Sequence, residues 1–194
     1  CTSTIIYQMY QEKGAAIDKK TAGILLAAII SDTLMFRSPT CTQMDRAAAE
    51  ALAKIAEVDI EELAKKMFEA GSDFKKKTTE ELFYQDFKTF HTDEFDFGVA
   101  QLSAMSDVQL GMAKKKLQPY LEIALGEQKL DAVFVMLTDI LDENSEVIYA
   151  GAQAGSLLKE CFGEPDESGS FYLKGVVSRK KQMIPALMAG LQQA

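Results

Sequence analysis

Hydrophobic positions in the first third of the chain recur every three to four residues. This spacing runs over 5–10 and, more broadly, over 22–30, and it places apolar side chains on one face of a helix. Pro39 bars a helix from the segment after the second pattern. Two further helices are predicted, over 47–56 and over 59–71. The first part of the chain is therefore expected to be helical throughout.

From residue 80 onward, short runs rich in β-forming residues alternate with segments of helical spacing. Strands interleaved with helices, including one hairpin, are typical of an α/β or α+β domain with a mixed sheet. The predicted strands cover 87–92, 95–105, 131–140, 145–150 and 171–177, and the predicted helices cover 107–125, 155–162 and the segment after Ser178.

The two patterns meet in a polar stretch that begins at Gly71 and contains three consecutive lysines, Lys75 to Lys77. Such a stretch is typical of a solvated linker between domains. The predicted fold class is α/β in two domains. We predict a mostly helical domain over 1–71, a linker over 72–79 and a mixed-sheet α/β domain over 80–194.

The chain of 194 residues carries a net charge of −8, with a pI of about 4.8. An acidic chain repels nucleic acid and anionic membranes, so neither is an expected partner. No apolar run approaches the roughly 20 residues of a membrane span, and no secretory signal opens the chain. The three cysteines favour buried free thiols in the cytoplasm. A chain that starts at Cys1 is expected to be cut from a larger protein.

One segment that could carry chemistry follows the apolar helix over 22–30. Asp32 comes directly after its last apolar residues and before an irregular loop. Carboxylate oxygen is the ligand that manganese and magnesium favour. A single carboxylate does not hold a metal, and the alternative interpretation is the ordinary polar end of a helix.

Two further segments carry cations. Lys88 lies between two phenylalanines on a predicted strand, where a lysine more often faces solvent. Arg179 and Lys180 follow Ser178 in the first turn of the last helix, where cations oppose the helix dipole. A bound phosphate would give that arrangement a reason, because helix N-terminal amides and cations both favour an anion. A solvated basic turn is the alternative.

Other site chemistries find no support in the sequence. His91 is the single histidine, so histidine dyads and multi-histidine metal sites are excluded within the chain. No P-loop, dinucleotide-binding fingerprint, Ser/His/Asp set or zinc spacing is present.

Four segments, in this order and spacing, resemble the family II inorganic pyrophosphatases of the DHH phosphoesterase superfamily. Cys1 to Tyr7 is similar to the Ser/Thr-rich helix start after the family's Asp-His-His motif. Ile30 to Thr40 resembles its late metal-ligand segment, and Asp86-Phe87-Lys88 resembles its Asp-x-Lys strand. Ser178 to Gln182, Ser-Arg-Lys-Lys-Gln, resembles the signature of the family's C-terminal DHHA2 domain.

The resemblance implies a manganese-dependent hydrolase that splits inorganic pyrophosphate into two phosphates. Asp32 would be a metal ligand for Mn²⁺, with Mg²⁺ or Co²⁺ as alternatives. Lys88, Arg179 and Lys180 would bind the substrate phosphates, and the domains would close over the substrate. It also implies a homodimer of the full-length protein.

The family's other metal ligands have no counterpart in this sequence, and no catalytic residue is assigned within it. The chain alone is therefore expected to be inactive. Two alternatives stay open: an exopolyphosphatase-like enzyme with the same C-terminal domain, and a non-catalytic phosphate-binding module.

Overall fold

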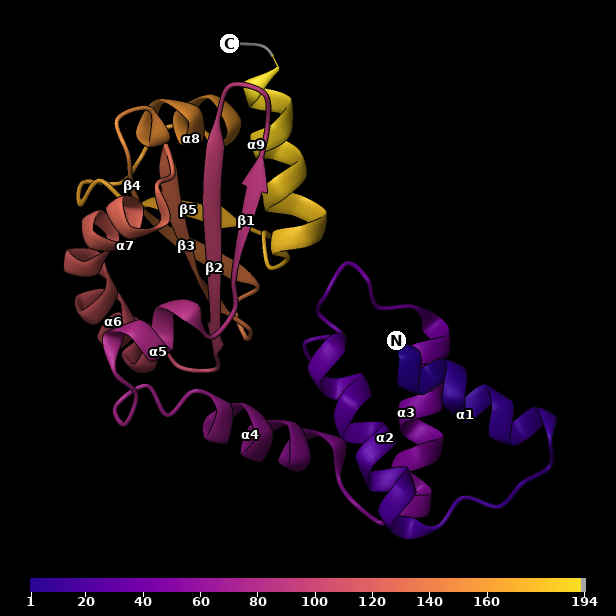
Figure 1. Ribbon diagram of the computed structural model, residues 1–194. Coiled ribbons are helices and arrows are strands. Elements are labelled where there is room, and N and C mark those ends of the chain that lie inside the picture. The colour runs from indigo at the N-terminus through magenta and orange to yellow at the C-terminus, as the bar shows by residue number, and fades with distance from the viewer. Residues whose placement is uncertain (193–194) are drawn as a thin grey trace. The chain divides into compact units, whose positions relative to one another are not determined.

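The structure, a computed structural model, describes residues 1–192. Its internal contacts divide the chain into two compact units, Cys1–Gly71 and a second unit that starts at Ser72 (Figure 1). The two units differ in class, since the first is helical and the second contains a sheet.

The first unit consists of four helices, as its hydrophobic spacing predicts. A core of buried aliphatic side chains, with Leu26, Ile29, Ile30 and Leu52 fully buried, holds the helices together. The helices are α1 (Thr2–Glu12), α2 (Lys19–Asp32), α3 (Gln43–Ala56) and α4 (Ile60–Gly71).

Helix α3 begins earlier than its run of alanines indicates, because a capping box stabilises its start. Thr42 accepts a hydrogen bond from the Asp45 amide, and the Asp45 carboxylate accepts one from the Thr42 amide. Asp45 also accepts from the Thr4 hydroxyl of α1 at 2.5 Å and from the N-terminal ammonium of Cys1 at 3.0 Å. This buried carboxylate therefore ties α1 to α3.

The pKa of Asp45 reflects two opposing effects. Burial alone would raise the pKa of this carboxyl, but hydrogen bonds from Thr4, Thr42 and the N-terminal ammonium outweigh burial and hold it well below its ordinary value. Asp45 is therefore an anion in the folded protein at any physiological pH.

The second unit is built on a five-stranded sheet in the order β1-β2-β3-β4-β5. Strands β2 and β3 are parallel and the other neighbouring pairs are antiparallel, so the mixed-sheet α/β class predicted from the sequence is confirmed. The strands are β1 (Phe87–His91), β2 (Asp96–Ala104), β3 (Ala132–Asp139), β4 (Asn144–Ala150) and β5 (Phe171–Lys174).

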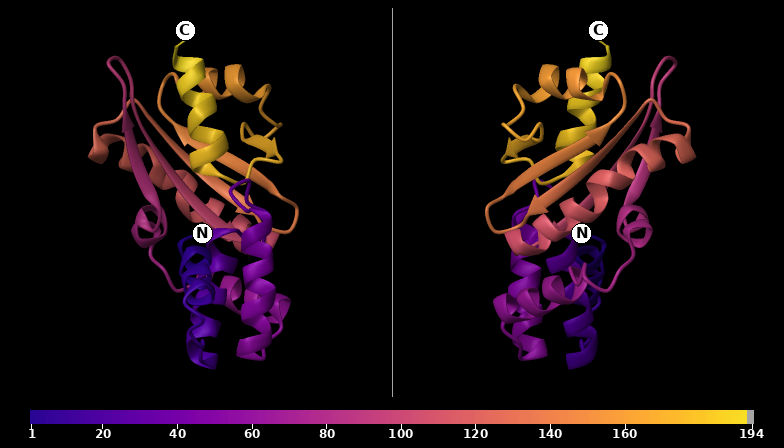
Figure 2. Two further views of the ribbon diagram at one scale, coloured as in Figure 1. Left: turned by 90° about the vertical axis from the view of Figure 1, so that its right-hand side faces the viewer. Right: turned by 90° about the vertical axis from the view of Figure 1, so that its left-hand side faces the viewer.

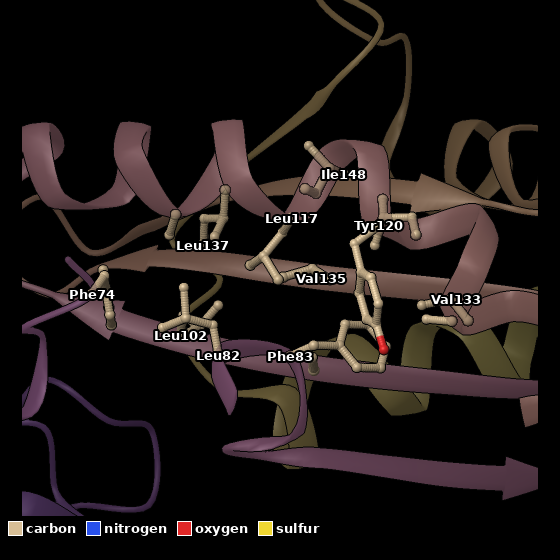
Figure 3. Packing of buried hydrophobic residues seen from close by; sticks show 14 of the residues in the cluster. Phe74, Leu82, Phe83, Leu102, Leu117, Tyr120, Val133, Val135, Leu137 and Ile148 are labelled. Atoms are coloured by element: carbon tan, nitrogen blue, oxygen red, sulfur yellow. The ribbon is translucent and has the colours of Figure 1, made fainter. Parts of the chain in front are cut away.

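Helices cover both faces of this sheet (Figure 2). One face packs against α5 (Thr79–Tyr84), α6 (Asp107–Leu117), the 3₁₀ turn η1 (Gln118–Tyr120) and α7 (Leu121–Gln128). Figure 3 shows part of this core, in which Leu117 and Tyr120 lie over Val133 and Val135 of β3. The other face packs against α8 (Ala154–Phe162) and α9 (Ile184–Leu191). Burial on both faces explains why β3 is a continuous apolar run.

Three details differ from the sequence predictions. The helix predicted over 107–125 is interrupted at η1, because Pro119 lacks an amide hydrogen and favours a tighter turn there. The last strand ends at Lys174 because Gly175 adopts a left-handed backbone, with φ of 74°. The segment 72–79 is not simply solvated, since Phe74 lies in the core and the Lys116 ammonium donates to its carbonyl at 2.9 Å.

Two further observations concern the remaining sequence features. The three cysteines are free but only partly buried, so the prediction of buried thiols is wrong in degree. Within residues 1–192, no helix has the length and apolar character needed to cross a membrane.

Replacing Asp45 by Asn should destabilise the helical unit by about 1–3 kcal/mol at neutral pH, because charge-assisted hydrogen bonds are lost. The folded-state pKa is lowered, so this stabilisation is present above the unfolded pKa of about 3.9 and is lost as pH falls toward the folded value. Native-state hydrogen exchange of the α1 and α3 amides measures the effect. Glu50→Gln, an exposed change on α3, is the control; equal protection in both variants would contradict the role of Asp45.

Candidate functional site

The basic segment predicted to bind phosphate forms a helical turn of unusual geometry. Arg179–Met183 is a π-helix, η2, that leads into α9, and the Met183 amide donates to the Ser178 carbonyl five residues earlier at 3.2 Å. Single π-turns are rare and frequently occur at functional sites. The geometry therefore singles out the same segment that the sequence does.

The side chains of Ser178 and Gln182 both cap the start of this turn. The Ser178 hydroxyl accepts from the Lys181 amide at 3.3 Å. The Gln182 side-chain oxygen accepts from the amides of Val177 at 2.9 Å and Ser178 at 3.0 Å, and its amide group donates to the Gly175 carbonyl at 2.7 Å. These reciprocal bonds satisfy backbone groups that a helix start leaves unpaired. Ser and Gln in this motif thus shape the turn.

Arg179 is largely buried, with its side chain only 10% exposed. Its guanidinium donates to the Asp86 carbonyl at 2.5 Å, the Asp86 carboxylate at 2.7 Å and the Val99 carbonyl at 3.1 Å. Three of its five N–H donors are engaged by these bonds, so at most two could reach a ligand. Arg179 is therefore part of the packed structure, and the alternative interpretation of a solvated basic turn does not hold for this residue.

Lys180 and Lys88 differ from Arg179 in exposure. Both side chains are solvent-exposed, and neither forms an ion pair within residues 1–192. Lys88 pairs with Val99 across β1 and β2 and shares its sheet face with Phe90, which packs on the core beneath α8 and α9. Because Met183 of the basic turn packs in the same core as Val99 and Phe90, the structure brings Lys88 and the basic turn to one face of the sheet.

The predicted metal-ligand residue Asp32 is exposed and ends α2. It precedes three consecutive residues with left-handed backbone: Leu34 with φ of 48°, Met35 with 51° and Phe36 with 68°. None is glycine, and each such residue costs roughly 1–2 kcal/mol. Strain of this kind persists where surrounding contacts enforce it and clusters at functional sites.

Those surrounding contacts are present on both sides of the strained turn. The Thr33 hydroxyl donates to the Ile29 carbonyl at 2.7 Å and accepts from the Phe36 amide at 3.2 Å. The Arg46 guanidinium donates to the Phe36 carbonyl at 2.8 Å and lies 5.0 Å from the centre of its ring. The backbone after Asp32 is thus fixed by its own unit.

The donor chemistry of Asp32 suits a hard divalent cation, but the described residues do not complete a site. Within residues 1–192, no group of three His, Cys, Asp or Glu side chains is arranged to hold a metal ion. A manganese ion would need ligands beyond those that residues 1–192 supply.

Sequence reasoning missed two parts of this arrangement. The left-handed residues 34–36 carry no sequence signal, because all three are large apolar types. Asp86 stands in the Asp-x-Lys pattern, yet its pairing with Arg179 joins residues 93 positions apart. Such a contact depends on the folded sheet.

Comparison with known proteins agrees with the fold. The DHHA2 domain model matches residues 65–189, and the chain belongs to this domain family.

More specific relatives are manganese-dependent inorganic pyrophosphatases. The chain is 41% identical to that of Bacillus subtilis, covering 96% of this chain and 60% of the relative. It is 40% identical to a probable one from Clostridium acetobutylicum, covering 99% and 62%. A crystal structure from Methanococcus jannaschii, assigned to the family II inorganic pyrophosphatases, matches with a TM-score of 0.84 at 32% identity. It covers 98% of this chain and 64% of that one. The chain thus spans about three fifths of the curated relatives' length.

Replacing Arg179 by Met should destabilise the sheet unit by about 1–3 kcal/mol, because three hydrogen bonds are lost and Asp86 loses its partner. Asp86→Asn should cost less, since the Asp86 side chain is 49% exposed.

A double-mutant cycle of the two changes, measured by urea unfolding, should show non-additive losses. Lys181→Met, an exposed neighbour in the same turn, is the control. Additive losses, or an Arg179→Met variant as stable as the control, would exclude the coupling.

Proposed function

We propose that the chain contributes the phosphate-binding half of a manganese-dependent inorganic pyrophosphatase, which hydrolyses pyrophosphate to two phosphates. The observation that carries this proposal is the capped basic turn at Ser178–Gln182, which lies on the same sheet face as Lys88. The names and identities of the relatives support the substrate.

Lys88, Lys180 and Arg179 would have different roles in binding phosphate, because their surroundings differ. Lys88 and Lys180 keep an unpaired charge and would bind phosphoryl oxygens directly. Arg179 is partly neutralised by Asp86 and would offer at most its two remaining N–H donors. Positive groups held in place before reaction stabilise charge that develops on the leaving phosphate without further reorganisation.

We further propose that Asp32 is one ligand of the manganese, with Mg²⁺ or Co²⁺ as alternatives. When bound, such an ion lowers the pKa of water and neutralises phosphate charge. In this proposal residues 1–71 contribute to metal binding, residues 72–79 form the linker between the two domains, and residues 80–194 bind the substrate. The carboxylate and the cations therefore lie on different units of the chain.

In the full-length protein, Lys88→Ala and Lys180→Ala should each lower kcat/KM for pyrophosphate by roughly 10²-fold, the usual loss for one charge-stabilising donor. Melting temperature should hardly change, because neither side chain is buried or paired within 1–192. Lys115→Ala, an exposed lysine of α6 on the opposite sheet face, is the matched control. An equal loss in the control would overturn the assignment. Faster phosphate release from long polyphosphate than from pyrophosphate would favour the exopolyphosphatase alternative.

The 194-residue chain alone should release no phosphate from pyrophosphate with Mn²⁺ beyond a buffer control, since its described part offers no complete metal site. A colorimetric phosphate assay over a range of protein concentrations measures this. Turnover that rises with protein concentration and disappears in the Lys180→Ala variant would show that the chain is sufficient.

A further inference from the structure

The segment from Gly175 to Arg179 crosses the sheet. It leaves β5 at one edge, and the Arg179 side chain at its end reaches Asp86, beside β1, at the other edge. Because this segment is neither strand nor complete helix, its amides and carbonyls need other partners. Side chains from the strands beneath it supply them.

Gln101, Thr138 and Ser145 form a polar row beneath the crossing segment, one on each of β2, β3 and β4. Thr138 and Ser145 are fully buried, next to the apolar stretches of β3 and β4. A buried hydroxyl costs free energy unless it is hydrogen-bonded, and no buried side-chain polar atom of residues 1–192 lacks a partner. The row is thus a fully hydrogen-bonded network at buried positions where apolar side chains would avoid the free-energy cost of burying a hydroxyl.

The bonds of the row have one consistent direction. The Ser145 hydroxyl donates its single hydrogen to the Val176 carbonyl at 2.7 Å. It therefore accepts from the Thr138 hydroxyl, 2.8 Å away, and Thr138 in turn accepts from the Gln101 amide group at 2.9 Å. Each hydroxyl donates once, so the orientation of the whole row is determined.

Gln101 joins this row to the basic turn itself. Its amide nitrogen also donates to the Val177 carbonyl at 3.0 Å, and its oxygen accepts from the Arg179 backbone amide at 3.3 Å. One side chain thereby fixes the backbone on both sides of Ser178. The Arg179 guanidinium fixes the same turn from β1, through Asp86.

We propose that Gln101 is a positioning residue: with Thr138 and Ser145 it sets the backbone of the turn, and thereby where Arg179 and Lys180 meet a phosphate. Gln101 itself does not contact the substrate. The inference rests on the proposed function for its ligand, and on the hydrogen bonds alone for its geometry.

The test compares 194-residue chains that carry Gln101→Met or Gln153→Met. Gln101→Met removes all three bonds with little change in volume, whereas Gln153 is exposed at the start of α8. Inorganic pyrophosphate is titrated by calorimetry well below the melting temperature, and amide exchange of residues 177–183 is followed by NMR. We expect Gln101→Met to raise the Kd for pyrophosphate about tenfold and to speed exchange in the turn. Gln153→Met should change neither.

A second pair of variants keeps the test decisive if Gln101→Met fails to fold. Thr138→Val removes the hydroxyl in a side chain of the same shape, and Thr138→Ser retains it. Weaker binding with Val and recovery with Ser supports the row as a positioning device. A purely structural role would lower melting in both Val and Met variants while leaving the Kd unchanged, and this result would overturn the proposal.

The two proposals fail in different ways. If the unmodified chain binds no pyrophosphate, phosphate binding by this chain is refuted, and with it the role of Gln101 toward the ligand. Unchanged exchange of residues 177–183 in Gln101→Met, with pyrophosphate still bound by the unmodified chain, refutes the positioning alone.

Discussion

The position of the basic turn in the sheet unit depends on one charged contact, which joins Arg179, after the edge strand β5, to Asp86, before the opposite edge strand β1. The Arg179 guanidinium, carried in from the edge strand β5, binds the Asp86 carboxylate and carbonyl beside β1. Because the Arg179 side chain is largely buried and forms several hydrogen bonds at once, the contact fixes direction as well as distance. The start of the last helical segment is thereby anchored to the edge that carries Lys88.

The same contact shapes the electrostatics of the face. The chain is acidic overall, with a net charge of −8, so an anion approaches it against the general field. Asp86 neutralises part of the Arg179 charge, but Lys88 and Lys180 keep theirs. Arg179 is buried and paired, whereas Lys88 and Lys180 are exposed and form no ion pair within residues 1–192. Burial thus separates a structural cation from the two lysines that are proposed to bind phosphate.

Sequence patterns predicted much of the fold because the information is local. The helices of the first unit follow from apolar spacing, although the capping box at Thr42 that starts α3 was missed. The break at Pro119 was missed, although proline is a local signal, because the apolar spacing continues through it. The sequence motifs indicated the candidate site residues one at a time. The burial of Arg179 could not be predicted, since it arises from pairing with a residue 93 positions away.

The strained turn after Asp32 is a local feature that the sequence nevertheless does not predict. Left-handed backbone at Leu34, Met35 and Phe36 is unfavourable for each residue alone, so no local preference predicts it. It exists because Thr33 and Arg46 bind the turn from both ends. A more relaxed loop would cost less, and three such residues in a row would together cost roughly 3–6 kcal/mol if unsupported. The backbone that carries Asp32 is thus fixed by contacts within its own unit, which the proposed role of Asp32 as a metal ligand requires.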